Sequence, residues 1–306
     1  MKYLKNKRHL KVFFLLILIF NCHFIISQTR YVDGVFDTVS SKTYTFAIKK
    51  LDSLKLDLYQ PINDDLKKRP LFIIIHGGGF KTGARNDKSL ISLANGIAKK
   101  GFVVASVEYR LLDKKTIFNC NLPFNEALKI YTNAEEDVLE AISYILRGNF
   151  KIDPKKIILF GTSAGAETLL NIAYNKQLLG KRSKRYKNIS IAGLISISGA
   201  ILNSTLINKS NAVPGVFYHG TEDKVIPYYQ GAHRSCSPLD KGYFVMDGSK
   251  KIVEKLESLH KSFMFYGYKN KGHNILNLPS EDFKEAFIFI RKVVFDGSFY
   301  QMSVVK

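Results

Sequence analysis

The stretch IILFGTSAG at residues 157–165 is a short apolar run that ends in a serine between two glycines. Residues 164–174 continue from it as a predicted helix, so the serine lies in a strand–turn–helix context. Glycines flank it because such a tight turn leaves no room for side chains on the neighbouring backbone. The helix that follows directs its N-terminal amides toward a developing negative charge. We therefore interpret Ser163 as a candidate nucleophile above the end of a buried strand.

Apolar segments alternate with helical ones on both sides of this stretch. Strands are predicted at 44–49, 54–59, 71–76, 102–109, 157–161, 191–197, 216–219 and 263–268, and helices at 87–100, 133–147, 164–174, 249–260 and 281–294. This alternation predicts the α/β class, with one doubly wound, mostly parallel sheet covered by helices on both faces. Residues 203–212 and 229–248 are irregular, and stretches of that length usually serve as lids or binding elements.

A run of three glycines follows the predicted strand 71–76, in the sequence His76-Gly77-Gly78-Gly79. Glycines at the end of a strand allow backbone N–H groups to turn inward without steric obstruction. Together with the amide of Ala164, the amides of this loop are candidate donors to the oxyanion of a tetrahedral intermediate. The alternative is a flexible surface loop.

A serine nucleophile needs a base and an acid that orients the base. His273 comes just beyond the last predicted strand, at the same sheet edge as Ser163, and His233 in the long irregular stretch is the reserve candidate. Asp223 follows the predicted strand 216–219, and Glu222 ranks second to it. The chain order Ser, Asp, His favours Asp223 and His273, because the α/β-hydrolase fold uses this order.

Residues 1–27 are typical of a secretory signal peptide. Five Lys or Arg residues precede the apolar run Val12–Phe20, and Ser27 ends a plausible cleavage site. We therefore expect residues 28–306 to form a single catalytic domain that is secreted or periplasmic. No stable membrane span is expected after cleavage.

Two alternatives to cleavage remain. An uncleaved anchor is disfavoured because the apolar stretch extends only from Val12 to Ile26. A helix that spans a bilayer needs roughly 20 apolar residues. Lipidation at Cys22 is weaker still, since Asn21 before it is larger than the usual small residue. The remaining cysteines, Cys120 and Cys236, either form a disulfide or are two separate buried thiols.

The chain has a formal net charge of +20, which falls to about +15 without the signal. Its lysines are scattered rather than gathered in a binding stripe, so we expect no nucleic-acid partner. Neither a zinc-binding motif nor a phosphate-binding loop is present, so the prediction includes no metal and no cofactor.

The chain resembles the α/β-hydrolase esterases of the hormone-sensitive-lipase and carboxylesterase type, with the HGGG loop, over residues 50–295. Further motifs that carry the resemblance are Leu56–Tyr59, Val107–Leu111, Asp153-Pro154, His219–Asp223 and Gly272-His273. The resemblance implies an α/β-hydrolase fold and a triad of Ser163, Asp223 and His273. It also implies oxyanion donors on Gly78, Gly79 and Ala164. The chain departs from many relatives in its long interval between Asp223 and His273, and in Thr162 and Ala166.

Together these features predict a secreted serine carboxylic-ester hydrolase that acts through an acyl-enzyme on Ser163. Its expected substrates are small-molecule esters or acyl, feruloyl or acetyl esters of carbohydrates. Two alternatives stay open. One is a serine peptidase of the prolyl-oligopeptidase type, which shares the fold, and the other is a non-catalytic hydrolase-fold binding protein.

Overall fold

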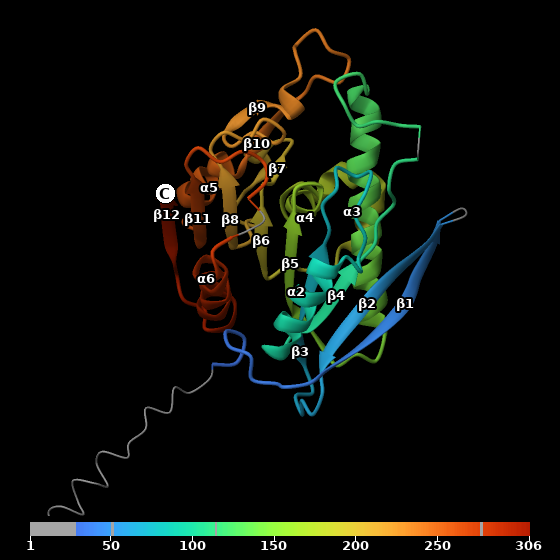
Figure 1. Ribbon diagram of the computed structural model, residues 1–306, viewed down its shortest axis with the longest axis vertical. Helices are drawn as coiled ribbons and strands as arrows, with labels where there is room; N and C mark the ends of the chain where they lie inside the picture. The colour runs from blue at the N-terminus through green and yellow to red at the C-terminus, as the bar shows by residue number, and fades with distance from the viewer. Residues whose placement is uncertain (1–28, 50–51, 114, 276–277) are drawn as a thin grey trace, which may run out of the picture.

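A nine-stranded sheet runs through the computed structural model, which describes residues 29–49, 52–113, 115–275 and 278–306. The predicted signal peptide at 1–27 lies outside the described residues. The strands lie in the order β1-β2-β4-β3-β5-β6-β8-β11-β12 (Figure 1). Their bounds are Val39–Lys49 (β1), Asp52–Pro61 (β2), Arg69–Ile75 (β3), Val103–Val107 (β4), Ile152–Thr162 (β5), Gly193–Ile197 (β6), Gly215–Gly220 (β8), Phe263–Tyr268 (β11) and Gln301–Val305 (β12).

Only the first part of this sheet is antiparallel. β1 pairs antiparallel with β2, and β2 with β4, whereas every pair from β4 to β12 is parallel. All seven residues of β3 and all five of β4 are buried. Strands covered on both faces need apolar residues at every position, which explains their continuous apolar sequences.

Helices cover both faces of the sheet (Figure 1). α3 (Phe124–Arg147), α4 (Ala164–Tyr174) and α5 (Ser249–Ser258) contribute to one hydrophobic cluster, while α2 (Lys88–Lys99) and α6 (Ser280–Ile290) contribute to the other. Alternate residues of β5 face the two clusters: Ile157 and Leu159 belong to the first, Ile158 and Phe160 to the second. The predicted doubly wound sheet is therefore confirmed.

Several elements differ from their predicted bounds. α3 begins at Phe124 rather than at residue 133, because Pro123 provides an extended start and the added turns bury Ala127 and Tyr131. β12 was not predicted, since five residues with mixed burial give no clear period. Short helical turns occupy Lys176–Tyr186 (η1), Ser204–Leu206 (η2) and His233–Ser235 (η3), and a π-helical turn occupies Arg291–Phe295 (η4).

The second irregular stretch, 229–248, takes part in a second, smaller sheet. β10 (Val245–Gly248) pairs antiparallel with β7 (Ala200–Ile201) and with β9 (Gln230–Ala232). These strands have two to four residues each, too few for a hydrophobic period to show. The small sheet anchors both ends of the predicted loop 229–248 beside the carboxyl edge of the main sheet.

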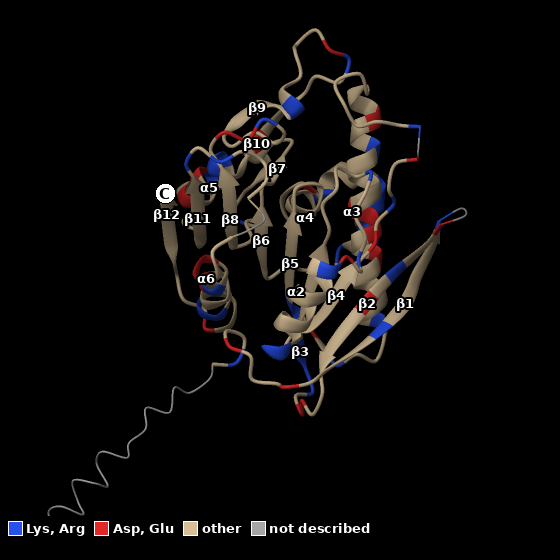
Figure 2. Ribbon diagram, viewed as in Figure 1, with Lys and Arg blue, Asp and Glu red and all other residues tan. Residues whose placement is uncertain are grey.

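A disulfide joins Cys120 to Cys236, with their Cα atoms 5.4 Å apart. The amide of Gly242 donates to the carbonyl of Cys120 at 2.8 Å beside it. These bonds connect the segment before α3 to the loop between β9 and β10. Lys and Arg residues are spread over helices, strands and loops among acidic residues (Figure 2). Among the described residues, no helix combines the length and apolar character needed to cross a bilayer.

Candidate active site

Ser163 lies at the turn between β5 and α4 with a left-handed backbone, φ 51° and ψ −123°. Both neighbouring glycines are required by close backbone approaches. A Cβ on Gly161 would lie 2.5 Å from the backbone of Gly165, and one on Gly165 would lie 2.2 Å from the carbonyl oxygen of Ile75. The sequence G-x-S-x-G therefore folds into the strained turn that lifts the Ser163 hydroxyl above the sheet.

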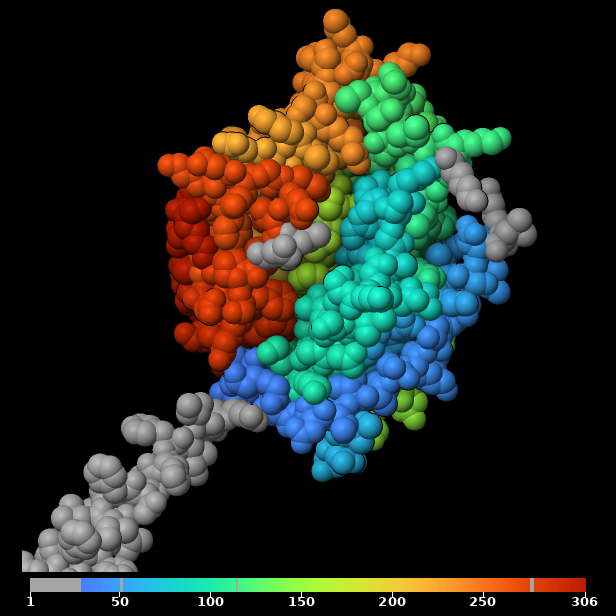
Figure 3. All heavy atoms as spheres, in the orientation of Figure 1, coloured from blue at the N-terminus to red at the C-terminus, as the bar shows by residue number. Residues whose placement is uncertain are grey.

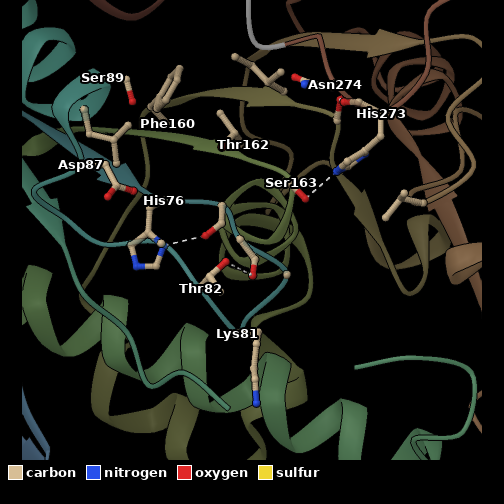
Figure 4. Close-up of a pocket in the computed structure, with 18 of the residues that line it drawn as sticks. His76, Lys81, Thr82, Asp87, Ser89, Phe160, Thr162, Ser163, His273 and Asn274 are labelled. Atoms are coloured by element: carbon tan, nitrogen blue, oxygen red, sulfur yellow. Dashed lines mark hydrogen bonds between the residues drawn. The ribbon is translucent and has the colours of Figure 1, made fainter. Parts of the chain in front are cut away.

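The predicted base His273 and the predicted acid Asp223 form a hydrogen-bonded chain with this hydroxyl. Ser163 Oγ is 2.8 Å from His273 Nε2, and His273 Nδ1 is 2.7 Å from Asp223 Oδ2. Figure 4 shows His273 reaching Ser163 from the opposite side of the pocket to His76 and Asp87. The three side chains follow β5, β8 and β11, whose carboxyl ends share one edge because these strands are parallel.

Asp223 is held on both of its oxygens. Oδ1 accepts the amides of Val225 at 2.8 Å and Ile226 at 2.9 Å, while Oδ2 faces His273 and lies 3.3 Å from His219 Nε2. Burial by itself would raise the pKa of the Asp223 carboxyl. The hydrogen bonds and charges of His219 and His273 outweigh burial and hold that pKa well below its usual range. Asp223 is therefore a carboxylate throughout the neutral range.

The glycine loop after β3 presents unused backbone donors. Gly78 and Gly79 have φ values of 105° and 60°, and a Cβ on Gly78 would lie 2.1 Å from the carbonyl oxygen of Thr82. Within the described part of the chain, the amides of Gly78 and Gly79 donate no hydrogen bond. Ala164 is the first residue of α4, where an amide has no intrahelical acceptor. These three amides are thus free to bind an oxyanion.

His76 shapes the glycine loop rather than acting as a base. Its Nδ1 lies 2.8 Å from the carbonyl oxygen of Gly77, and its ring stacks on Tyr109 at 4.4 Å between centroids. The Tyr109 hydroxyl donates to the His76 carbonyl at 3.0 Å. Burial lowers the pKa of the His76 imidazole, so the ring is neutral near pH 7.

The two second-ranked residues lie elsewhere. His233 is buried, stacks on Phe244 at 4.9 Å and lies 3.5 Å from Glu167 Oε1. Burial and the positive charge of Arg234 lower the pKa of His233 to about 3, so this ring is neutral. Glu222 is exposed, and among the described residues its carboxyl forms no hydrogen bond or ion pair with His219 or His273.

Sequence reasoning missed Glu167, which lies one helical turn after Ser163. Its carboxyl is buried and accepts the Tyr131 hydroxyl at 2.8 Å. Burial raises its pKa from 4.5 to about 7, against the opposing effects of Tyr131, Arg234 and His273. An acidic residue at i+4 from the nucleophile, in a helix with no other charged residue, was the available signal.

Replacing Glu167 by glutamine should change how stability depends on pH. The raised pKa of Glu167 means that folding takes up a proton between pH 4.5 and about 7. The wild-type protein therefore loses folding stability as pH rises through that window, because Glu167 must ionise in a buried site. We expect the variant to gain about 3 kcal/mol in unfolding free energy relative to wild type between pH 4.5 and 8. Urea unfolding at several pH values measures the difference. A difference independent of pH would contradict this assignment.

Ser163 opens into a pocket of about 1260 Å³. Figure 3 shows a hollow between the teal segments after β3 and the red C-terminal segments. One part of the wall is apolar and consists of Leu90, Leu93, Phe160 and Phe283. Arg234 lies in another part, together with Ile117, Phe118 and Val225.

Within the described residues, one cluster with metal-ligand spacing consists of Cys120, Cys236 and Asp240. Both of its sulfurs are in the disulfide and offer no thiolate.

Comparisons with known proteins identify a family and several related esterases. The BD-FAE family model matches residues 56–208. Probable carboxylesterase 1 of Arabidopsis thaliana is 27% identical over 227 residues, covering 70% of this chain and 63% of that protein. Gut esterase 1 of Caenorhabditis briggsae is 30% identical over 120 residues, covering 39% of this chain and 20% of that protein. The chain thus spans less than two thirds of the length of either relative.

Solved structures show the same architecture. The native thermophilic esterase Est2 of Thermogutta terrifontis superposes with a TM-score of 0.62 at 15% identity, over 83% of this chain and 93% of that one. The same esterase phosphorylated by paraoxon gives a TM-score of 0.62 at 13% identity, over 85% and 95%. At these identities the likeness concerns the fold, and it confirms the predicted α/β-hydrolase architecture.

Proposed function

The chain belongs to the BD-FAE family of α/β hydrolases, and on this premise we propose that it hydrolyses carboxylic esters through an acyl-enzyme on Ser163. The alignment of Ser163 Oγ, His273 and Asp223 carries the proposal. A hydroxyl becomes an effective nucleophile when an oriented imidazole takes its proton, and this chain holds such an imidazole at 2.8 Å.

The first half-reaction acylates the serine. His273 Nε2 takes the proton from Ser163 Oγ as the oxygen forms a bond to the ester carbonyl carbon. The carbonyl π electrons move to oxygen, and the amides of Gly78, Gly79 and Ala164 bind the resulting oxyanion. Each such donor typically contributes about 3 kcal/mol of transition-state stabilisation. The C–O bond then breaks, and the imidazolium of His273 gives its proton to the departing alkoxide.

The second half-reaction frees the enzyme. His273 takes a proton from water, whose oxygen attacks the acyl carbon, and the same amides hold the second oxyanion. Collapse expels Ser163 Oγ, which recovers its proton from His273, and the acid product leaves. Asp223 keeps its negative charge throughout, because its hydrogen bonds hold its pKa well below neutrality.

The proposal extends to the substrate and its location. A pocket of about 1260 Å³ exceeds the volume of roughly 300–1,000 Å³ that small-molecule sites usually have, which favours carbohydrate-linked acyl, feruloyl or acetyl esters in addition to small ones. The disulfide supports export to a periplasm or the cell exterior, because such bonds persist in oxidising compartments.

Turnover and labelling of the purified protein test the proposal together. We expect hydrolysis of p-nitrophenyl acetate, and complete inhibition when one equivalent of a fluorophosphonate probe is bound. Peptide mass spectrometry should locate the probe on Ser163, since phosphonylation requires an activated serine. A folded protein that neither turns over the ester nor binds the probe would contradict the proposal and favour a non-catalytic binding role.

A further inference from the structure

Arg234 lies in the wall of the ester pocket, beside the glycine loop. A Cβ on Gly79 would lie 3.1 Å from Arg234 Nη2, so the guanidinium is adjacent to the loop that carries two of the oxyanion donors. Its Cζ lies 5.2 Å from the centroid of the Phe118 ring. When an arginine stacks on an aromatic face, the N–H groups of its planar guanidinium still point outward, in the plane of that group.

The backbone holds Arg234 firmly in this position. Arg234 and Ser235 both have left-handed φ values, 54° and 53°, and the Arg234 amide donates to the Val225 carbonyl at 2.7 Å. The disulfide at Cys236 attaches the next turn to Cys120. The side chain of Arg234 thus extends from a rigid backbone segment. This rigidity lowers the conformational entropy that is lost when Arg234 binds a ligand.

The guanidinium has no close polar partner in the described part of the chain. No carboxylate oxygen lies within ion-pair distance of Arg234, and its side chain donates no hydrogen bond to any described residue. The buried carboxyl of Glu167 interacts with its charge only from beyond ion-pair distance. Its Nε is buried without an acceptor. The other cation of the pocket wall, Lys81, differs because its Nζ donates to the carbonyls of Asp113 and Thr116. Buried donors of a charged group are costly unless a partner accepts them.

Ester hydrolysis by the triad requires no permanent positive charge beside the pocket. The oxyanion is bound by backbone amides, and the charge that forms on His273 is balanced by Asp223. A fixed, unpaired guanidinium in an ester pocket is therefore available to the substrate. Its planar fork matches a carboxylate in geometry and charge.

We propose that Arg234 binds a carboxylate carried by the substrate, so that the enzyme prefers esters with an anionic group over neutral esters of the same shape. This inference rests on the proposed esterase function. The carboxylate belongs either to the acyl part or to the alcohol part of the ester, and both place the same chemistry against Arg234.

Two matched substrate pairs test the proposal and separate these two sources. For the acyl part, p-nitrophenyl hydrogen glutarate is compared with the ester in which an isopropyl group replaces its carboxylate. For the alcohol part, p-acetoxybenzoate is compared with p-acetoxybenzamide. We expect Arg234→Gln to lower the ratio of kcat/KM values, anionic over neutral, by about tenfold or more in one pair, mainly through KM. Added salt should weaken the preference of the wild type alone.

Two further variants sharpen the result. Arg234→Lys should retain part of the preference, because it keeps the charge and loses the fork. Lys241→Gln removes one positive charge from the same disulfide-held loop at an exposed position outside the pocket wall, and should leave both ratios unchanged. Thermal unfolding verifies that each variant is folded.

The outcomes separate this inference from the proposed function. If Arg234→Gln lowered kcat/KM equally for anionic and neutral esters, the inference would be overturned. Arg234 would then support the oxyanion or the glycine loop for every ester alike. A wild type that turns over no ester would instead contradict the proposed function. In that case, calorimetric binding still decides the role of Arg234, since binding needs no turnover. For the alcohol part p-hydroxybenzoate is compared with p-hydroxybenzamide, and for the acyl part glutarate is compared with 5-methylhexanoate. Equal affinity within both pairs would overturn the inference.

Discussion

Replacing Ser163 by alanine is expected to lower kcat for p-nitrophenyl acetate by about 10⁵- to 10⁶-fold. The variant lacks the oxygen that attacks the ester, and His273 Nε2 then has no serine proton to accept. The amides of the glycine loop and of Ala164 remain, so a residual rate above that in water should persist. Steady-state and single-turnover kinetics on the purified variant measure the loss.

Alanine is a well-matched replacement at this position. It keeps the Cβ that Ser163 already places at φ 51°, so backbone strain is unchanged and the fold should be preserved. Ser198 provides a control of the same residue type, because it lines the same pocket with φ 52° and donates to the His273 carbonyl at 3.1 Å. Ser198→Ala should cost less than about tenfold. If Ser163→Ala kept a hundredth of the wild-type rate, another group would be the nucleophile.

The catalytic arrangement was predictable because it depends on strand direction more than on strand order. Ser163, Asp223 and His273 follow β5, β8 and β11, and the carboxyl ends of parallel strands meet at one edge whatever their neighbours are. Hydrophobic pattern predicts such strands, and the glycines around Ser163 specify the turn. Local sequence patterns were therefore enough to predict that three residues far apart in the chain lie at one site.

What the sequence did not reveal depends on contacts between distant segments. Arg234 enters the pocket only because the small sheet and the disulfide fold its loop back onto the segment before α3. Two cysteines separated by 116 residues specify a pairing but not the distance between them. β12 is an edge strand with half-exposed residues, so no continuous apolar run indicates it. Such features are set by packing, which a local pattern does not contain.

Asp223→Asn should lower kcat by about 10⁴-fold, although the side chain keeps its shape. In the wild type, Oδ1 accepts the amides of Val225 and Ile226. The asparagine oxygen must take this place, because its NH₂ group would face two donors there. The NH₂ group is then directed at His273 Nδ1, where Oδ2 lies 2.7 Å away in the wild type.

This orientation determines the tautomer of His273. A donor at Nδ1 requires that nitrogen to be unprotonated, so the ring proton moves to Nε2 and faces Ser163 Oγ, and the imidazole no longer accepts the serine proton. Kinetics near neutral pH measure the loss, and NMR of the imidazole nitrogens reports the tautomer. Glu222→Gln, at the exposed neighbouring carboxyl, should retain full activity. If Asp223→Asn lost less than tenfold while Glu222→Gln lost more, the orienting acid would be Glu222, and the bonds that hold Asp223 would serve only the β8 turn.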